Sequence, residues 1–182
     1  MNQKTIKKII SKELFKLDKK SISQNKFPLS VTQYDENDVI NLLKTLIRGW
    51  PTIGNEVKKV ELKIQKLLKT KNAIMLNSGG SANYLMLYLL QSPYAKKEHR
   101  LKSGDEILTP AVTWSTTVGP IIQNNFVPVL LDVNLSTYDI NADLIERSIT
   151  KKTKAIMIVH PLGHVCNMKK IKSISSKHKV PI

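Results

Sequence analysis

The sequence predicts an α/β protein in which helices cover both faces of a parallel β-sheet. Two observations support this fold class. Short apolar runs alternate with helical segments in the second half of the chain, and right-handed crossovers between such runs give a parallel sheet. A strand–glycine–helix sequence at residues 73–90 precedes this alternation. A length of 182 residues with 41% hydrophobic content is sufficient for one domain with a sizeable core.

The first expected element is an amphipathic helix over residues 3–19, with apolar side chains on one face and lysines on the other. The apolar residues are Ile6, Ile9, Ile10, Leu14 and Leu17. Such a helix can lie on a membrane, but packing on the protein itself or on a partner subunit is the favoured interpretation. Residues 1–26 are therefore expected to form a helical extension, with the main domain beginning at residue 27.

Two more helices are expected before residue 70. Asp35 suits an N-cap, with Asp38 as its capping-box partner, and apolar residues at helical spacing follow. This helix should end near Trp50, because the proline that follows pushes it out of the α region. The second helix should cover about residues 56–69, with five side chains directed inward. They are Val57, Val60, Ile64, Leu67 and Leu68.

The stretch at residues 73–90 is a candidate phosphate site. Residues 73–76 read as a buried strand, and two glycines and a helix follow, so that free N–H groups at the helix start point toward an anion. Gly80 lets the backbone approach a ligand closely, and Ser81 can cap the helix and offer its hydroxyl. A tight connection with an ordinary serine cap is an equally good interpretation. The spacing matches neither a P-loop nor a dinucleotide-binding fingerprint.

The remaining strands and helices place four loops at one edge of the sheet. The expected strands are 106–109, 128–133, 154–159 and 180–182, and the expected helices are about 116–123, 142–149 and 168–177. Ligands bind beyond the carboxyl ends of parallel strands, which places residues 77–81, 110–115, 132–134 and 160–163 along one rim. Trp114 on this rim can lie flat on an aromatic ligand ring, or it can serve as a loop anchor.

Composition disfavours several classes of protein. The net charge is +15, but among 29 basic residues only Arg48, Arg100 and Arg147 are arginines, the residues that read bases. No basic cluster carries interleaved aromatic residues, so nucleic-acid binding is not favoured. No run of 18 apolar residues and no signal-peptide pattern occurs, so we expect a cytoplasmic protein without a membrane partner.

A metal site is also not favoured. His160, His164 and Cys166 are metal-ligand types, but Pro161 and Gly163 break any helix that would align the two histidines, and no fourth ligand is evident. Polar residues in a loop after a strand are the better interpretation. The single cysteine excludes an internal disulfide.

Several blocks together resemble one family. They are Trp50–Gly54 with Glu61; Asn77–Ala82; Gly104–Glu106 with Thr109, Pro110, Thr113 and Trp114; Pro128 and Val129 with Asp132, Val133 and Ile140; and Val159–Gly163. In this order they resemble the DegT/DnrJ/EryC1/StrS family of pyridoxal-phosphate enzymes that act on nucleotide-linked keto sugars. The resemblance implies that residues 27–182 are the N-terminal portion of the three-layer large domain of a type I aspartate-aminotransferase-like fold, incomplete at its C-terminus.

The resemblance also implies a cofactor and its contacts. Pyridoxal 5′-phosphate would be held through its phosphate by Gly80 and Ser81, with Trp114 stacked on its ring. Gly80 departs from the family, which usually has Ser or Thr there. The acidic partner of the ring nitrogen and the Schiff-base lysine, or the histidine that replaces it in the dehydrases, are expected beyond Ile182. We therefore expect no catalytic residue and no activity from this chain alone.

Three functions are expected in order. The first is transfer of an amino group, from a donor such as glutamate, to a nucleotide-linked 4-keto or 3-keto deoxysugar in surface polysaccharide biosynthesis, by an intact homodimer. The second is 3-dehydration of such a sugar, because residues 77–83 and 92–103 look closest to the dehydrase branch, although the neighbours of Trp114 differ from its usual Gly-Phe-Pro. The third is a non-catalytic fragment or a basic nucleic-acid-associated module.

Overall fold

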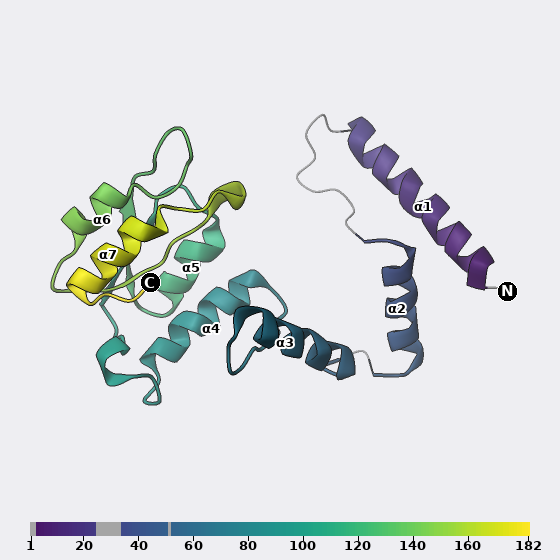
Figure 1. Cartoon of the computed structure of the whole chain (residues 1–182), viewed down its shortest axis with the longest axis horizontal. Helices are drawn as coiled ribbons and strands as arrows, with labels where there is room; N and C mark the ends of the chain where they lie inside the picture. The colour runs from purple at the N-terminus through teal and green to yellow at the C-terminus, as the bar shows by residue number, and fades with distance from the viewer. Residues whose placement is uncertain (1–2, 25–33, 51) are drawn as a thin grey trace. The chain divides into compact units, whose positions relative to one another are not determined.

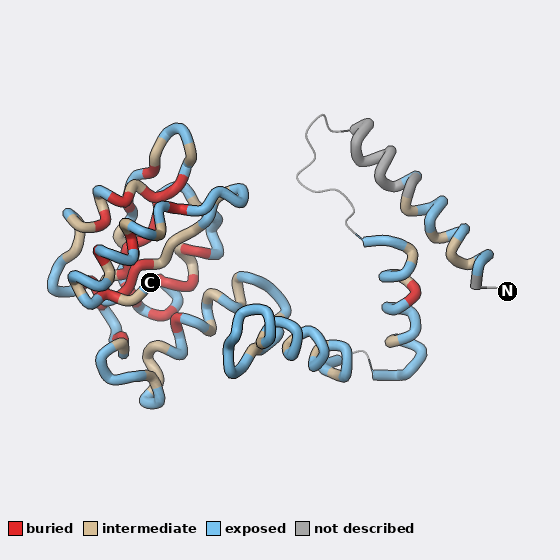
Figure 2. The backbone as a smooth tube through the Cα atoms, viewed as in Figure 1, coloured by how far each residue is buried: buried red, intermediate tan, exposed pale blue. Residues whose placement is uncertain are grey.

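The computed structural model describes residues 3–24, 34–50 and 52–182. The expected start of the main domain at residue 27 lies outside the described residues. The chain divides into two compact units, Met1–Met75 and Leu76–Ile182. Burial is concentrated in the second unit, whereas most of the described residues of the first are exposed (Figure 2). No described helix is both long enough and apolar enough to cross a membrane.

The first unit contains three helices: α1 (Gln3–Gln24), α2 (Glu36–Ile47) and α3 (Asn55–Leu68) (Figure 1). The capping box expected at α2 is confirmed. The Asp35 carboxylate accepts hydrogen bonds from the N–H groups of Asn37 and Asp38, at 2.8 and 3.1 Å, and the Asp38 carboxylate accepts from the N–H of Asp35 at 3.0 Å. The helix then ends at Ile47 with Arg48 as its C-cap, just before the predicted stop.

Two expectations for this unit are wrong. None of the residues of α3 is buried, and Leu67 of the predicted inward face is 75% exposed. An apolar stripe identifies a face that can be buried, but burial also needs a surface to cover it. The strand expected at residues 73–76 is irregular and exposed at Ile74, and the N–H of Met75 donates to the Glu61 carboxylate at 2.9 Å rather than to a neighbouring strand.

The second unit is built on a three-stranded parallel sheet in the order β2-β1-β3. The strands are β1 (Glu106–Pro110), β2 (Val127–Leu131) and β3 (Thr153–Ile156). The helices are α4 (Gly79–Gln91), α5 (Ser115–Gln123), α6 (Ala142–Ser148) and α7 (Met168–His178), with short 3-10 turns at Lys97–His99 and Pro161–Gly163. The α/β fold with parallel strands is thereby confirmed (Figure 1).

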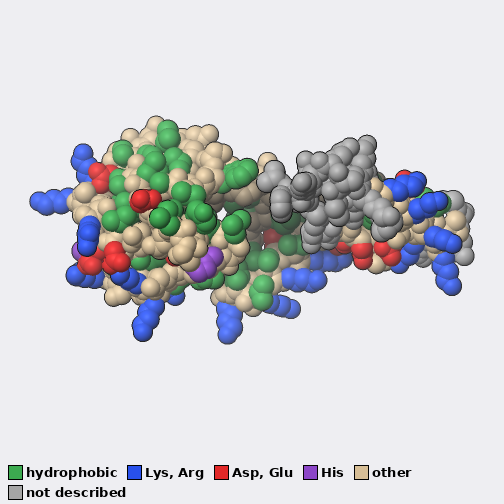
Figure 3. Space-filling view, turned by 90° about the horizontal axis from the view of Figure 1, so that it is seen from above, with side chains coloured by type: hydrophobic (Ala, Val, Ile, Leu, Met, Phe, Trp, Pro, Cys, Tyr) green, Lys and Arg blue, Asp and Glu red, His purple; other side chains and the backbone are tan. Residues whose placement is uncertain are grey.

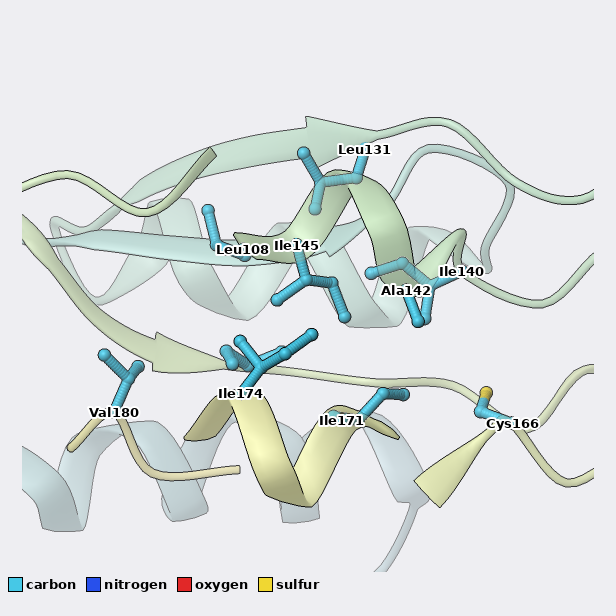
Figure 4. Close-up of a cluster of buried hydrophobic side chains, with 10 residues drawn as sticks. Leu108, Leu131, Ile140, Ala142, Ile145, Cys166, Ile171, Ile174 and Val180 are labelled. Atoms are coloured by element: carbon cyan, nitrogen blue, oxygen red, sulfur yellow. The ribbon is translucent and has the colours of Figure 1, made fainter. Parts of the chain in front are cut away.

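The two faces of the sheet carry separate cores. Successive residues of a strand point to opposite faces, so Ile107 and Leu108 of β1 enter different cores. Leu108 packs with Ile145 of α6 and Ile171 of α7 in a cluster that Figure 4 shows in close-up. Ile107 joins a second cluster with residues of α4 and α5. Helices therefore cover both faces, as the sequence predicted.

The strand expected at residues 180–182 is not formed. Val180 is buried, and the N–H of Ile156 donates to the carbonyl of Pro181 at 2.9 Å, so this segment lies beside β3. Proline has no N–H to return to the ladder, and the pairing remains a single hydrogen bond.

Many lysine and arginine side chains lie on the surface. On the face drawn in Figure 3, Lys and Arg side chains project at separate places rather than in one patch.

Candidate functional site

The N-terminus of α4 differs in one detail from the expectation. The residue that caps the helix is Ser78, whose Oγ accepts a hydrogen bond from the N–H of Ser81 at 3.1 Å. The expected capping role of Ser81 is wrong because Ser81 lies inside the first turn. A cap must precede the helix with an extended backbone, and Ser78 has φ −160° and ψ 161°.

This capping leaves two backbone donors available. The N–H of Ser81 is used by Ser78, and the N–H of Ala82 donates to the carbonyl of Ser78 at 3.1 Å. The N–H groups of Gly79 and Gly80 have no acceptor among the described residues. Partial positive charge at a helix N-terminus favours an anion at these two groups.

A cavity of about 340 Å³ opens beside them, between α4 and α5. Its lining residues are Ser78, Gly80, Ser81, Ser115, Thr116, Gly119, Pro120 and Gln123. Four of these residues carry hydroxyl groups and none is charged. The two helices are tied together here, since the Asn83 side-chain amide donates to the carbonyl of Thr116 at 2.9 Å. Hydroxyl groups from both helices can therefore donate to one small anion.

Gly80 has a packing role that the sequence did not reveal. A Cβ at this position would lie 3.2 Å from Cγ2 of Thr116 and 3.8 Å from Oγ of Ser78, whereas a Cβ at Gly79 would meet no atom within 4 Å. Glycine at position 80 therefore allows α4 to approach α5 closely where the cavity forms. Local sequence could not show this, because Thr116 lies on another helix.

Trp114 lies immediately before the cavity-lining turn of α5. It occupies the N-cap position of α5, and its indole is 71% exposed. The preceding loop is held by a hydrogen bond of 2.9 Å from the Thr113 hydroxyl to that of Thr117. Such exposure does not fit a buried loop anchor and leaves a ring face available. Stacking on a cofactor ring stays a prediction.

The loop at residues 132–141 on the rim is held by its own side chains. The buried Asp139 carboxylate accepts hydrogen bonds from the Thr137 hydroxyl and, at 3.0 Å, from the Asn134 amide. These bonds, that of Thr137 foremost, lower the pKa of Asp139. Hydrogen bonds within the chain therefore hold this loop.

The loop that carries His160 and Cys166 is also held by hydrogen bonds within the chain. The N–H of Cys166 donates to Nδ1 of His160 at 3.2 Å, and the Cys166 thiol donates to the carbonyl of Val159 at 3.0 Å. Burial raises the pKa of the Cys166 thiol. Within the described residues, no three His, Cys, Asp or Glu side chains are grouped so as to hold a metal ion.

Two of the predicted contacts, Gly80 and Ser81, thus line the cavity, and Trp114 precedes it. His160, His164 and Cys166 do not line it. The sequence interpretation placed Ser115 on the rim but missed Thr116 and Gln123 of α5. The only signal for Thr116 was its position next to this rim segment.

A parallel sheet covered by helices, with an uncharged, hydroxyl-lined cavity between α4 and α5, places the chain in the α/β class. Residues 32–182 match the family model described as the DegT/DnrJ/EryC1/StrS aminotransferase family, and the chain belongs to this family. The sequence resemblance is confirmed.

Known relatives are similar over most of this chain. It is 40% identical over 139 residues to the lipopolysaccharide biosynthesis protein RfbH of Salmonella typhimurium, which covers 76% of this chain and 32% of that protein. The E. coli GDP-4-keto-6-deoxy-D-mannose-3-dehydratase with bound hydrated PLP has a TM-score of 0.77 at 33% identity, over 85% of this chain and 39% of that one. Spr1654 of Streptococcus pneumoniae, named as a sugar aminotransferase, gives 0.74 at 29% identity, over 84% and 36% in its PMP form. The chain spans about a third of the length of the curated relatives it matches.

The residues at the α4–α5 cavity fit the phosphate of pyridoxal 5′-phosphate. Two unpaired N–H groups and four hydroxyl residues supply donors, and no carboxylate lines the cavity to repel a dianion. The family is one of pyridoxal-phosphate enzymes, and solved relatives carry this cofactor.

Proposed function

We propose that this chain holds the 5′-phosphate of pyridoxal 5′-phosphate in the α4–α5 cavity. The observation that carries this proposal is the pair of unpaired N–H groups, Gly79 and Gly80, beside a cluster of hydroxyl side chains. Hydrogen bonds to a charged group contribute about 1.5–3 kcal/mol each, so three or four of them are sufficient to retain a phosphate without a lysine or arginine.

Ser81 donates through its side chain. Its N–H is occupied by Ser78, and the Ser78 hydroxyl donates to Oγ of Ser81 at 3.1 Å. The hydroxyl hydrogen of Ser81 is consequently left to point toward a phosphate oxygen. Gly80 contributes its N–H, and the missing side chain at this position keeps the two helices close.

Trp114 supplies the ring contact in this proposal. Its exposed indole precedes the turn of α5 that lines the cavity, so a ring attached to a phosphate in the cavity can reach the indole face. The cofactor, when bound, withdraws electrons from the substrate carbon. The residues of this chain bind and orient it, and residues 27–182 act as a portion of the large domain.

The proposed substrate is a nucleotide-linked keto deoxysugar used in surface polysaccharide biosynthesis. Similarity to the E. coli dehydratase supports loss of the 3-hydroxyl group as the reaction. Transfer of an amino group from a donor such as glutamate is the second candidate, supported by the similarity of Spr1654. In either case the intact enzyme is proposed to be a homodimer.

We further propose that the 182 residues alone bind the cofactor without turnover. Every residue of the second unit is described, and no lysine or carboxylate among them lines the cavity. The test is incubation with cofactor, glutamate and GDP-4-keto-6-deoxymannose, followed by mass spectrometry. We expect unchanged substrate, and a 4-amino or 3-deoxy product would contradict the proposal.

The coding sequence after the codon for Ile182 distinguishes the two reactions. An acidic motif followed in frame by a histidine would support dehydration, and one followed by a lysine would support amino transfer. A stop codon directly after Ile182 would contradict both assignments for this protein.

A further inference from the structure

A second and larger cavity lies in the first unit, at the connection from α2 to α3. Its volume is about 690 Å³, and its lining combines apolar and polar side chains with two cations and the Glu56 carboxylate. Leu42 and Ile53 supply apolar surface, Trp50 supplies an aromatic face, and Arg48 and Lys58 supply positive charge. The cofactor proposal does not use this cavity.

The indole of Trp50 is held in a fixed orientation although it is 65% exposed. Its Nε1–H donates to the carbonyl of Ile53 at 2.9 Å, which ties the ring to the turn that follows it. Gly54 packs against the ring edge, and a Cβ at Gly54 would lie only 3.2 Å from Cδ1 of Trp50. The ring face is therefore pre-organised for a flat ligand, which lowers the entropic cost of stacking.

The two cations of the lining, Arg48 and Lys58, retain capacity for an anion. Arg48 lies 3.6 Å from the Glu56 carboxylate, which is paired more closely with Lys59 at 2.9 Å. Lys58 has no ion-pair partner among the described residues. The cap of α3, Gly54, offers no side chain to its first N–H groups, so the helix start adds positive potential to the lining of the cavity.

We infer that this cavity binds a nucleotide, with the base stacked on Trp50 and the phosphates facing Arg48, Lys58 and the start of α3. An inorganic anion would leave the fixed indole unused, and an apolar peptide would leave the two cations unused. A ligand with a flat aromatic part and a negative part uses both the fixed indole and the two cations. The inference rests on the proposed function, since it assigns a place to the nucleotide of a nucleotide-linked sugar.

The test uses the Trp114→Phe protein, in which Trp50 is the only indole, titrated with GDP and followed by tryptophan fluorescence. We expect saturable quenching that weakens as salt rises, with guanosine and inorganic diphosphate each binding at least tenfold more weakly than GDP. Arg48→Gln should weaken GDP binding about tenfold or more. Lys63→Gln, which removes an exposed lysine of α3 outside the cavity lining, is the matched control and should have no effect.

Equilibrium dialysis of GDP with Trp50→Ala and Trp50→Phe separates stacking from folding, since Phe should restore most of the affinity lost in Ala. The inference is overturned if millimolar GDP produces no saturable quenching, or if Arg48→Gln behaves like Lys63→Gln. Pyridoxamine 5′-phosphate binding should be unaffected by Arg48→Gln, so failure of this cavity and failure of the α4–α5 site are distinguishable.

Discussion

A side chain at position 80 is predicted to make an unfavourable contact with Thr116. In Gly80→Ala, the new Cβ would lie 3.2 Å from Cγ2 of Thr116, which would have to move by a few tenths of an ångström. Adding a carbon to a tight contact costs about 1 kcal/mol, at the low end of overpacking, whereas alanine in place of glycine stabilises a helix by roughly 0.5–1 kcal/mol. The two effects nearly cancel in the free energy of unfolding, so the single variant should change little.

A double-mutant cycle with Thr116→Ser isolates the contact. Serine lacks Cγ2, and the nearest atoms to the new Cβ become Cβ of residue 116 at 3.5 Å and Oγ of Ser78 at 3.8 Å, which are ordinary distances. In this background Gly80→Ala should stabilise by roughly 0.5–1 kcal/mol, giving a coupling energy of about 1 kcal/mol.

The assay for this cycle is urea unfolding followed by circular dichroism. Gly79→Ala, whose Cβ meets no atom within 4 Å, is the control and should not depend on residue 116. A coupling energy indistinguishable from zero would refute the assignment of Gly80 to helix packing.

Four further predictions follow from named groups. Trp114→Ala should weaken pyridoxamine 5′-phosphate binding by about 0.5–1.5 kcal/mol in calorimetry and leave urea stability unchanged, and Trp114→Phe should recover most of the affinity. The pKa of Asp139 is lowered, so its contribution to stability is present above its unfolded pKa of about 3.9 and is lost as pH falls through the lower folded value. Asp139→Asn should therefore make the free energy of unfolding depend less on pH in the acid range. An unchanged pH dependence would contradict this prediction. The buried Cys166 thiol, with its raised pKa, should react slowly with Ellman's reagent at pH 7.5 and rapidly in urea; equal rates would exclude its burial. Oligonucleotide binding should be absent at physiological salt, and tight binding there would favour the nucleic-acid alternative.

Patterns within a short stretch of sequence predicted the elements that depend on residues close in the sequence or on burial against the sheet. The capping box at Asp35 depends only on residues within three positions, and it is present as expected. Apolar periodicity predicted the strand β1 and the helices α5 to α7. It succeeded there because the apolar faces of these helices pack against the sheet.

The errors arise where a second segment decides the outcome. Periodicity marked residues 73–76 as a buried strand, but a strand exists only beside another strand, and Met75 binds Glu61 instead. Pro181 ends the pairing beside β3 for a reason that is visible in the sequence, namely its missing N–H. The contact of Gly80 with Thr116 joins positions far apart in the chain, and no local signal indicates it.

We propose that the N-terminus of α4 and the residues of α5 that line the same cavity hold the cofactor phosphate. The most direct measurement compares pyridoxamine 5′-phosphate with pyridoxamine by calorimetry, since neither ligand condenses with surface lysines. We expect one saturable site for the phosphate form, at least tenfold weaker binding of pyridoxamine, and a loss of about 1–2 kcal/mol in Ser81→Ala but not in Ser176→Ala on the exposed face of α7. Equal affinity for the two ligands, or equal behaviour of the two serine variants, would contradict the claim.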